Sequence, residues 1–238
     1  MPILRSIPSF RTVMKKFLFL PLLALLGAGG AHAEPSRSSL ALRIETCEAI
    51  LQTFQARTDL AVPAEVWQRA KGVIILNQFK AGFFFGLKTG YGVVMVKKAD
   101  GRWSVPVLIN ASEASFGFQI GAKSVENIFI ITDEATPRML FRQRFNIGVD
   151  AKSVAGPKAA EIERNLEELL RTPLLAYTRN LGLYAGATVK AGNIMRNDEV
   201  NFILYNTKYA MPELLYSDWV APPPEVQPLM SLVQQLSP

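Results

Sequence analysis

The sequence predicts an α+β domain: a curled, mostly antiparallel, barrel-like sheet with an N-terminal amphipathic helix and one further long helix packed on it. Three observations support this fold class. Apolar residues recur at helical spacing in residues 38–56, and again in residues 158–171. Between these helices, residues 72–149 are rich in Val, Ile and Phe, punctuated by glycine, and alternate between apolar and polar side chains, as half-buried strands do.

The first 33 residues have the pattern of a secretory leader. Arg11, Lys15 and Lys16 precede an apolar run too short to span a bilayer, which ends in an A-x-A cleavage motif at residues 31–33. We therefore expect cleavage after Ala33 and a periplasmic or secreted protein, with a single domain at residues 34–238. Met14 also begins a self-sufficient leader, so translation starts at either Met1 or Met14.

Loss of the leader would change the chemistry that the chain can perform. It removes the only histidine, His32, and four of the 26 basic residues but none of the 20 acidic ones, so the net charge falls from +6 to +2. A nearly neutral chain argues against binding to nucleic acid. Without histidine, a Ser-His-Asp or Cys-His catalytic device and a zinc site built on imidazole are excluded. We expect no metal and no cofactor.

Cys47 is the only cysteine, so no intramolecular disulfide can form. It does not follow the leader directly, and we therefore expect no lipid anchor. Its place on an apolar stripe predicts a small buried hydrophobic residue rather than a reactive thiol.

The predicted first helix covers Ser38 to Ala56, with Ser38 or Ser39 as its N-cap. A single apolar stripe runs along it: Leu40, Ile44, Cys47, Leu51 and Phe54. Two interpretations remain open. The stripe packs on the core, which is the commoner case, or it lies on a membrane surface with Arg43 beside it. A short helix at 63–70 should follow.

Several segments between residues 72 and 149 have the pattern of strands. An Asp-Gly turn at residues 99–102 indicates a hairpin whose return strand is 103–109. The remaining strand-like segments are 72–76, 91–97, 116–121 and 141–149.

The stretch AGFFFGLKTGYGVV, residues 81–94, combines three consecutive phenylalanines with four glycines. Lys88 and Thr89 interrupt any helical packing seam, and the glycine spacing fits neither a nucleotide-binding fingerprint nor a phosphate loop. The remaining interpretation is strands joined by tight turns, with glycines where the sheet bends or where another backbone approaches. Three consecutive side chains of a strand cannot share one face. Either both faces are covered, or one ring meets a lipid interface.

The C-terminal third should contain the second long helix at 158–171, strand-like segments at 174–191 and 200–205, and a proline-rich tail at about 206–238. Pro222 to Pro224 suggest an extended spacer within that tail. The pairs Asp133-Glu134 and Asp198-Glu199 have the character of turn residues.

A family resemblance is carried by motifs that occur in order from about Val62 to Tyr205. They are A-K-G at 70–72, D-G-R-W-S-V-P at 100–106, Q-I-G at 119–121, A-G-P at 155–157, A-Y-T-R-N-L-G-L-Y-A-G at 176–186 and N-D-E-V-N-F at 197–202. With them the chain resembles the SYLF domain family. The resemblance implies a lipid-binding module. Eukaryotic relatives bind phosphoinositide membranes, helped by an N-terminal amphipathic helix, and some bind actin, whereas bacterial relatives are exported.

The chain departs from the family pattern at Lys158-Ala159, where a Gly-Arg pair is usual, and lacks the anchoring cysteine. We expect a phospholipid-binding protein of the membrane surface, without catalysis. The alternatives are an envelope protein-interaction scaffold and, less favoured, a hydrolase that uses carboxylates such as Asp150 or Asp198. Apolar contact would come from Phe83, Phe84, Phe85 and Tyr184, and attraction of headgroup phosphate from Lys71, Lys88, Arg102, Arg142, Arg144 and Arg179.

Overall fold

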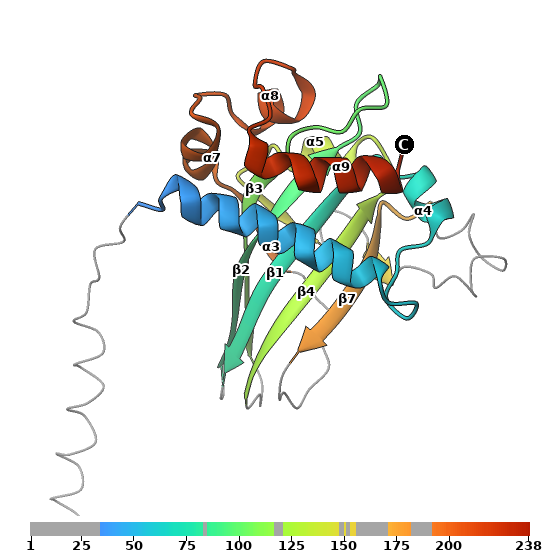
Figure 1. Cartoon of the computed structure of the whole chain (residues 1–238). Coiled ribbons are helices and arrows are strands. Elements are labelled where there is room, and N and C mark those ends of the chain that lie inside the picture. The colour runs from blue at the N-terminus through green and yellow to red at the C-terminus, as the bar shows by residue number, and fades with distance from the viewer. Residues whose placement is uncertain are drawn as a thin grey trace, which may run out of the picture. The chain divides into compact units, whose positions relative to one another are not determined.

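One sheet organises the fold of the computed structural model (Figure 1). The structure describes residues 34–82, 85–116, 121–147, 150, 153–155, 171–181 and 192–238. Residues 35–238 form one compact unit, and the description below concerns that unit alone. The leader and the helix expected at 158–171 lie outside the described residues.

The described strands form a sheet with the order β5-β8-β3-β2-β1-β4-β7-β6. Neighbours are antiparallel except β6 and β7, which are parallel. The fold class expected from the sequence is confirmed. The strands are β1 (Gly72–Gly82), β2 (Phe85–Val96), β3 (Val107–Phe116), β4 (Gly121–Ile131), β5 (Arg144–Asn146), β6 (Ser153–Ala155), β7 (Leu174–Leu181) and β8 (Asn193–Arg196).

Helix α3 (Arg37–Gln55) lies across β1 and β2, and helix α9 (Gln227–Leu236) lies beside it (Figure 1). The apolar stripe expected on the first helix is confirmed, and it faces the core: its five side chains are all buried. Ser36 is the N-cap instead of Ser38 or Ser39, because its Oγ accepts a hydrogen bond from the Ser39 N–H at 3.2 Å. Helix α4 (Ala64–Gln68) begins directly after Pro63.

Two glycines of β2 let the first hairpin close tightly. A Cβ at Gly90 would lie 2.1 Å from the Asn77 carbonyl oxygen, and one at Gly92 would lie 2.1 Å from that of Ile75. Neither position has room for a side chain. The glycines therefore mark a close approach of two backbones, as expected for this stretch.

The Asp-Gly turn is confirmed, but its return strand starts later than expected. The Lys98 N–H donates to the Arg102 carbonyl at 2.8 Å, and Gly101 has a φ of 83°. Beyond the turn, Trp103 forms an isolated bridge with Lys97, and regular pairing begins only at Val107. Pro106 has no N–H to donate to a ladder, which explains the delay.

The strand expected at 200–205 is wrong: these residues belong to helix α7 (Asp198–Tyr205). The Asn197 side chain caps the helix by accepting the Val200 N–H at 3.4 Å. Asp198 and Glu199 lie in the first turn, where negative charge stabilises a helix. Residues 200–205 have the apolar composition of a strand, but the cap provided by Asn197 favours a helix.

Two other strand-like segments are shorter than expected. Between helix α5 (Thr136–Met139) and β8, only Arg144–Asn146 of the segment 141–149 is a described strand. Arg142 precedes this strand, so Arg142 and Arg144 do not share one strand face. The segment 116–121 contributes only the last residue of β3 and the first residue of β4, and residues 117–120 lie outside the described part.

The proline-rich tail expected at about 206–238 contains short helices. Helix α8 (Met211–Tyr216) is followed by the 3-10 helix η2 (Pro224–Val226) and then α9. Val226, Leu229 and Val233 are fully buried in the core. Among the described residues, no helix is long and apolar enough to cross a membrane.

Candidate functional site

A cationic cleft lies at the end of the sheet where β1 begins and where β2 and β4 end. Gly72 pairs with Val96 on one side and with Ile131 on the other, so the residues that flank these positions must meet. The Lys71 N–H donates to the Ile131 carbonyl at 2.7 Å, and the Lys97 N–H to the Lys71 carbonyl at 2.9 Å. The cleft has a volume of about 860 Å³.

Positive charge dominates the lining of the cleft. Only one lining residue, Glu134, is acidic, and it pairs with Lys71 at 3.1 Å. The five cationic residues of the lining are Arg69, Lys71, Lys97, Lys98 and Arg138. Arg69 and Arg138 are exposed and form no ion pair with any residue that the structure describes. The cleft therefore offers two guanidinium groups to an anion, and guanidinium groups suit phosphate well.

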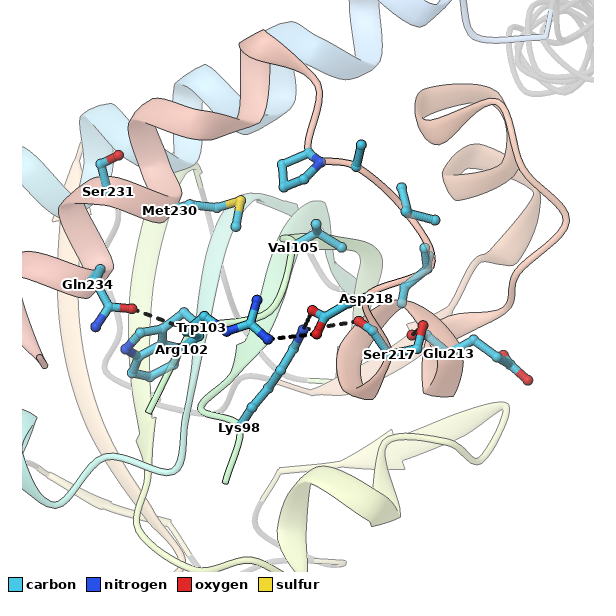
Figure 2. A pocket seen from close by; sticks show the side chains of 14 residues that line it. Lys98, Arg102, Trp103, Val105, Glu213, Ser217, Asp218, Met230, Ser231 and Gln234 are labelled. Atoms are coloured by element: carbon cyan, nitrogen blue, oxygen red, sulfur yellow. Dashed lines mark hydrogen bonds and ion pairs between the residues drawn. The ribbon is translucent and has the colours of Figure 1, made fainter. Parts of the chain in front are cut away.

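A second cavity of about 430 Å³, drawn in Figure 2, shares the lining residue Lys98 with the cleft. Its walls come from the turn between β2 and β3, from the segment that follows α8, and from α9. The apolar side chains among its lining are Trp103, Val105, Leu214, Val220, Ala221, Pro222 and Met230. Trp103 is held in place by hydrogen bonds from its Nε1 to the Ser237 carbonyl at 2.9 Å and from its backbone N–H to the Gln234 Oε1 at 3.3 Å.

Lys98 lines both cavities and takes part in a charged network at the boundary (Figure 2). Its Nζ lies 2.5 Å from Asp218 Oδ1 and donates to the Ser217 carbonyl at 3.0 Å. Arg102 Nη2 lies 2.6 Å from Asp218 Oδ2. Hydrogen bonds from Lys98 and then from Arg102 lower the pKa of Asp218 to about 2. This carboxylate therefore remains ionised at any physiological pH.

Of the expected headgroup-binding residues, Lys71 lines the cleft, and Arg102 lines the second cavity, which shares Lys98 with the cleft. Lys88 lies farther along β2, opposite Lys80 of β1 and Glu113 of β3. It is buried, its Nζ is 3.6 Å from Glu113 Oε2, and burial lowers its pKa to about 8. Lys88 is therefore a buried residue of a central strand and not a surface residue that could meet a headgroup.

The remaining expected residues lie apart from the cleft or beyond the described structure. Arg179 is paired with Glu126 at 2.5 Å. Arg142 and Arg144 are exposed near β5. Phe85 begins β2, whereas Phe83, Phe84 and Tyr184 lie outside the described residues.

Sequence reasoning missed Arg69, Lys97, Lys98 and Arg138 as a group. One signal was available: Lys71 precedes the strand-like segment 72–76, Lys97-Lys98 lie at the end of the segment 91–97, and tight turns were expected between the two. Antiparallel pairing brings such positions together. Arg69 and Arg138 join them through the pairing of β1 with β4, two strands that are not consecutive in the chain.

The acidic residues considered for hydrolysis have structural partners. Asp150 Oδ2 accepts the Asn146 N–H at 2.6 Å, and Asp198 Oδ1 accepts the Met211 N–H at 3.1 Å. Asp198 also pairs with Arg196 at 2.5 Å. Within the described ranges, no group of three or more His, Cys, Asp or Glu side chains could hold a metal ion.

Fold and cleft define the class: an α+β domain with a single curled sheet and an anion-attracting cleft at one end. The family model Ysc84, described as "Las17-binding protein actin regulator", matches residues 112–236, more than half of the chain. The chain therefore belongs to the SYLF (Ysc84) family, which confirms the resemblance seen in the sequence.

Relatives come from yeast and from mammals. The chain is 30% identical over 186 residues to LAS seventeen-binding protein 3 of Saccharomyces cerevisiae, an alignment that covers 77% of this chain and 40% of the relative. It is 27% identical over 194 residues to SH3 domain-containing YSC84-like protein 1 of Homo sapiens, which covers 79% of this chain and 57% of that protein. The chain thus spans less than two thirds of these relatives, and the name of the yeast relative describes a binding protein.

Proposed function

We propose that this protein binds phospholipid at a membrane surface, after export to the periplasm, and that it does so without catalysis. One observation carries the proposal: the cleft is lined by five cations and a single carboxylate. Clusters of Lys and Arg attract the phosphate of anionic headgroups, and each such residue contributes about 1 kcal/mol near a charged surface. The leader expected at residues 1–33 supports the location.

An apolar surface lies away from the cleft, on the β1–β2 hairpin. Phe79 and Leu87 are 53% and 59% exposed. They lie on the same face, because Phe79 pairs with Thr89 and Ala81 with Leu87. Phe79 is seven residues from Gly72, roughly 23 Å along a strand. The cleft and this surface are therefore separate, and the headgroup interaction rests on the cleft alone.

Flotation with vesicles tests the proposal. The purified protein should float with phosphatidylglycerol vesicles and not with phosphatidylcholine vesicles at low ionic strength. The double variant Arg69→Gln/Arg138→Gln should reduce flotation at least fivefold, because both guanidinium groups face the cleft. Arg142→Gln/Arg144→Gln carries the same change in charge at a different place and should behave like the wild type. Equal loss in both variants would show attraction by overall charge and would contradict a role for the cleft.

A protein-interaction scaffold is the second candidate, and a pair of exposed aromatic rings favours it. The rings of Tyr209 and Trp219 lie 5.1 Å apart, and Trp219 is 66% exposed. Exposed Trp and Tyr residues are enriched at the energetic centres of protein interfaces. Raising the salt concentration distinguishes the two functions, since charge-driven lipid binding should weaken and an apolar protein contact should not. A protein partner retained at 1 M salt and lost in Trp219→Ala would support the scaffold.

A further inference from the structure

The two cavities share one wall. Lys98 lines both cavities. The segment 216–218 also lies between them, because Tyr216 lines the cationic cleft and Ser217 and Asp218 line the second cavity. At this boundary the Lys98 Nζ donates hydrogen bonds to the Ser217 carbonyl at 3.0 Å and to Asp218 Oδ1 at 2.5 Å.

The chemical characters of the two cavities are complementary. The cleft carries five positive charges against one negative charge. The second cavity is lined by two cationic residues, Lys98 and Arg102, and two acidic ones, Asp218 and Glu213, so its formal charges balance, and much of the wall is apolar. Its volume of about 430 Å³ lies in the range of small-molecule pockets, which are mostly apolar with a few polar groups that fix orientation.

We propose that the second cavity receives the acyl chain of an anionic phospholipid whose phosphate lies in the cationic cleft, with Lys98 at the junction. This inference rests on the proposed function and specifies its ligand as an amphiphile. A molecule that spans the shared wall must be anionic at one end and apolar at the other. The acyl chain contacts apolar side chains such as Trp103, Val105 and Met230, and the charges of Lys98, Arg102 and Asp218 are paired with one another.

Asp218 has a defined role in this arrangement. In the structure it is the carboxylate that accepts from Lys98 Nζ, at 2.5 Å. A phosphate group bound at the junction replaces Asp218 as the partner of Lys98, while Asp218 keeps its contact with Arg102. Asp218 thus competes with the ligand, and its removal should strengthen binding.

Calorimetry with soluble probes tests the acyl-chain site. The probes are glycerol 3-phosphate and lysophosphatidylglycerols of increasing chain length, all below the concentration at which micelles form. Affinity should increase with chain length until the cavity is filled and then level off, as expected for burial of successive methylene groups. Equal affinity for every probe would overturn the acyl-chain site, and binding of the protein to phosphatidylglycerol vesicles would then still support the headgroup cleft.

A variant that fills the second cavity tests whether the acyl chain binds there. Ser231 is an exposed residue of α9 that lines the cavity, so Ser231→Trp fills the mouth without disturbing the core. It should abolish the gain with chain length and leave glycerol 3-phosphate binding unchanged. Gln235→Trp, at an exposed position of α9 outside the cavity lining, is the matched control. Wild-type chain-length dependence in Ser231→Trp would place the chain elsewhere and contradict the inference.

Two substitutions at the junction test the shared wall. Asp218→Asn should tighten binding of the lysophospholipid about threefold at low salt, since it removes a competing partner of an accessible ion pair. Lys98→Met should weaken binding. Unchanged affinity in both variants would exclude Lys98 from the ligand path. If the wild-type protein bound neither the soluble probes nor the vesicles, the proposed function itself would be rejected.

Discussion

Asn201 in α7 and Leu108 in β3 are joined by two hydrogen bonds. The Leu108 N–H donates to Asn201 Oδ1 at 2.8 Å, and Asn201 Nδ2 donates to the Leu108 carbonyl at 2.9 Å. Pairing between β3 and β8 begins at Ile109, one residue farther on. A single side-chain amide therefore continues the ladder where β8 ends, and it fastens α7 to the sheet.

Replacement of this amide should destabilise the domain. Asn201 is fully buried, so Asn201→Leu leaves both the N–H and the carbonyl of Leu108 without their partner. Each unsatisfied buried group costs about 1–3 kcal/mol, and we expect the free energy of unfolding in urea to fall by about 2–5 kcal/mol. Asn206→Gly is the control at the end of the same helix. Asn206 is exposed with a φ of 48°, which glycine adopts readily. The free energy of unfolding of Asn206→Gly should therefore equal or slightly exceed that of the wild type. Equal stability of Asn201→Leu and wild type would contradict this view of the amide.

Substitution of Gly90 should be far more damaging than substitution of Gly101. A Cβ at Gly90 would overlap the Asn77 carbonyl oxygen, so Gly90→Ala must separate β1 from β2 and should cost at least about 3 kcal/mol. Gly101 has open space around its Cα and only a positive φ, and Gly101→Ala should cost about 1–2 kcal/mol. Thermal unfolding of both variants measures the difference. Similar costs would show that the hairpin adapts.

The buried Lys88 should make stability rise with pH in the alkaline range. Its pKa of about 8 lies below the value of about 10.4 for an unfolded chain, so between these values the unfolded state binds the additional proton. The free energy of unfolding should therefore increase from pH 8 to pH 10. Lys88→Met should reduce this increase, and part should remain because burial also lowers the pKa of Lys123.

Urea titrations of wild type and Lys88→Met at pH 7.5, 8.5 and 9.5 check this expectation. The charged groups that face Lys88 across the strands are Lys80 and Glu113, with Lys123 one strand farther. Identical slopes in the two proteins would mean that Lys88 does not release its proton in this range.

Cys47 should be inert in the folded protein. It lies on the face of α3 that packs on the sheet and is fully buried, and burial raises the pKa of its thiol to about 12, so almost no thiolate is present at neutral pH. A disulfide reagent should label one thiol per chain in urea and none within minutes under native conditions. Rapid native labelling would mean that α3 leaves the sheet readily.

The sequence predicted best those elements whose pattern is local. The apolar stripe of α3 and the Asp-Gly turn each depend on residues that are close together in the chain, and both are present in the structure. Helix α7 was mistaken for a strand because its Val, Phe and Ile favour strands in isolation. The Asn197 cap is a local signal that the sequence did offer, whereas the burial of Asn201 depends on β3, which lies about 90 residues earlier in the chain.

The cleft was harder to predict than the fold. Lys71 was identified because it adjoins a glycine-rich segment, and this property says nothing about its neighbours. Arg69 and Arg138 become neighbours of Lys97 through the order of strands in the sheet, which residue spacing does not reveal. Lys88 was assigned to the surface, although the strand register places it between Lys80 and Glu113.

The contact between α3 and α9 determines when the domain can be completed. About 170 residues separate the two helices, so the core beneath α3 closes only after nearly the entire chain has been synthesised. Contacts between such distant segments form late and slowly. The docking of α9 beside α3 is therefore a late step in the folding of this domain.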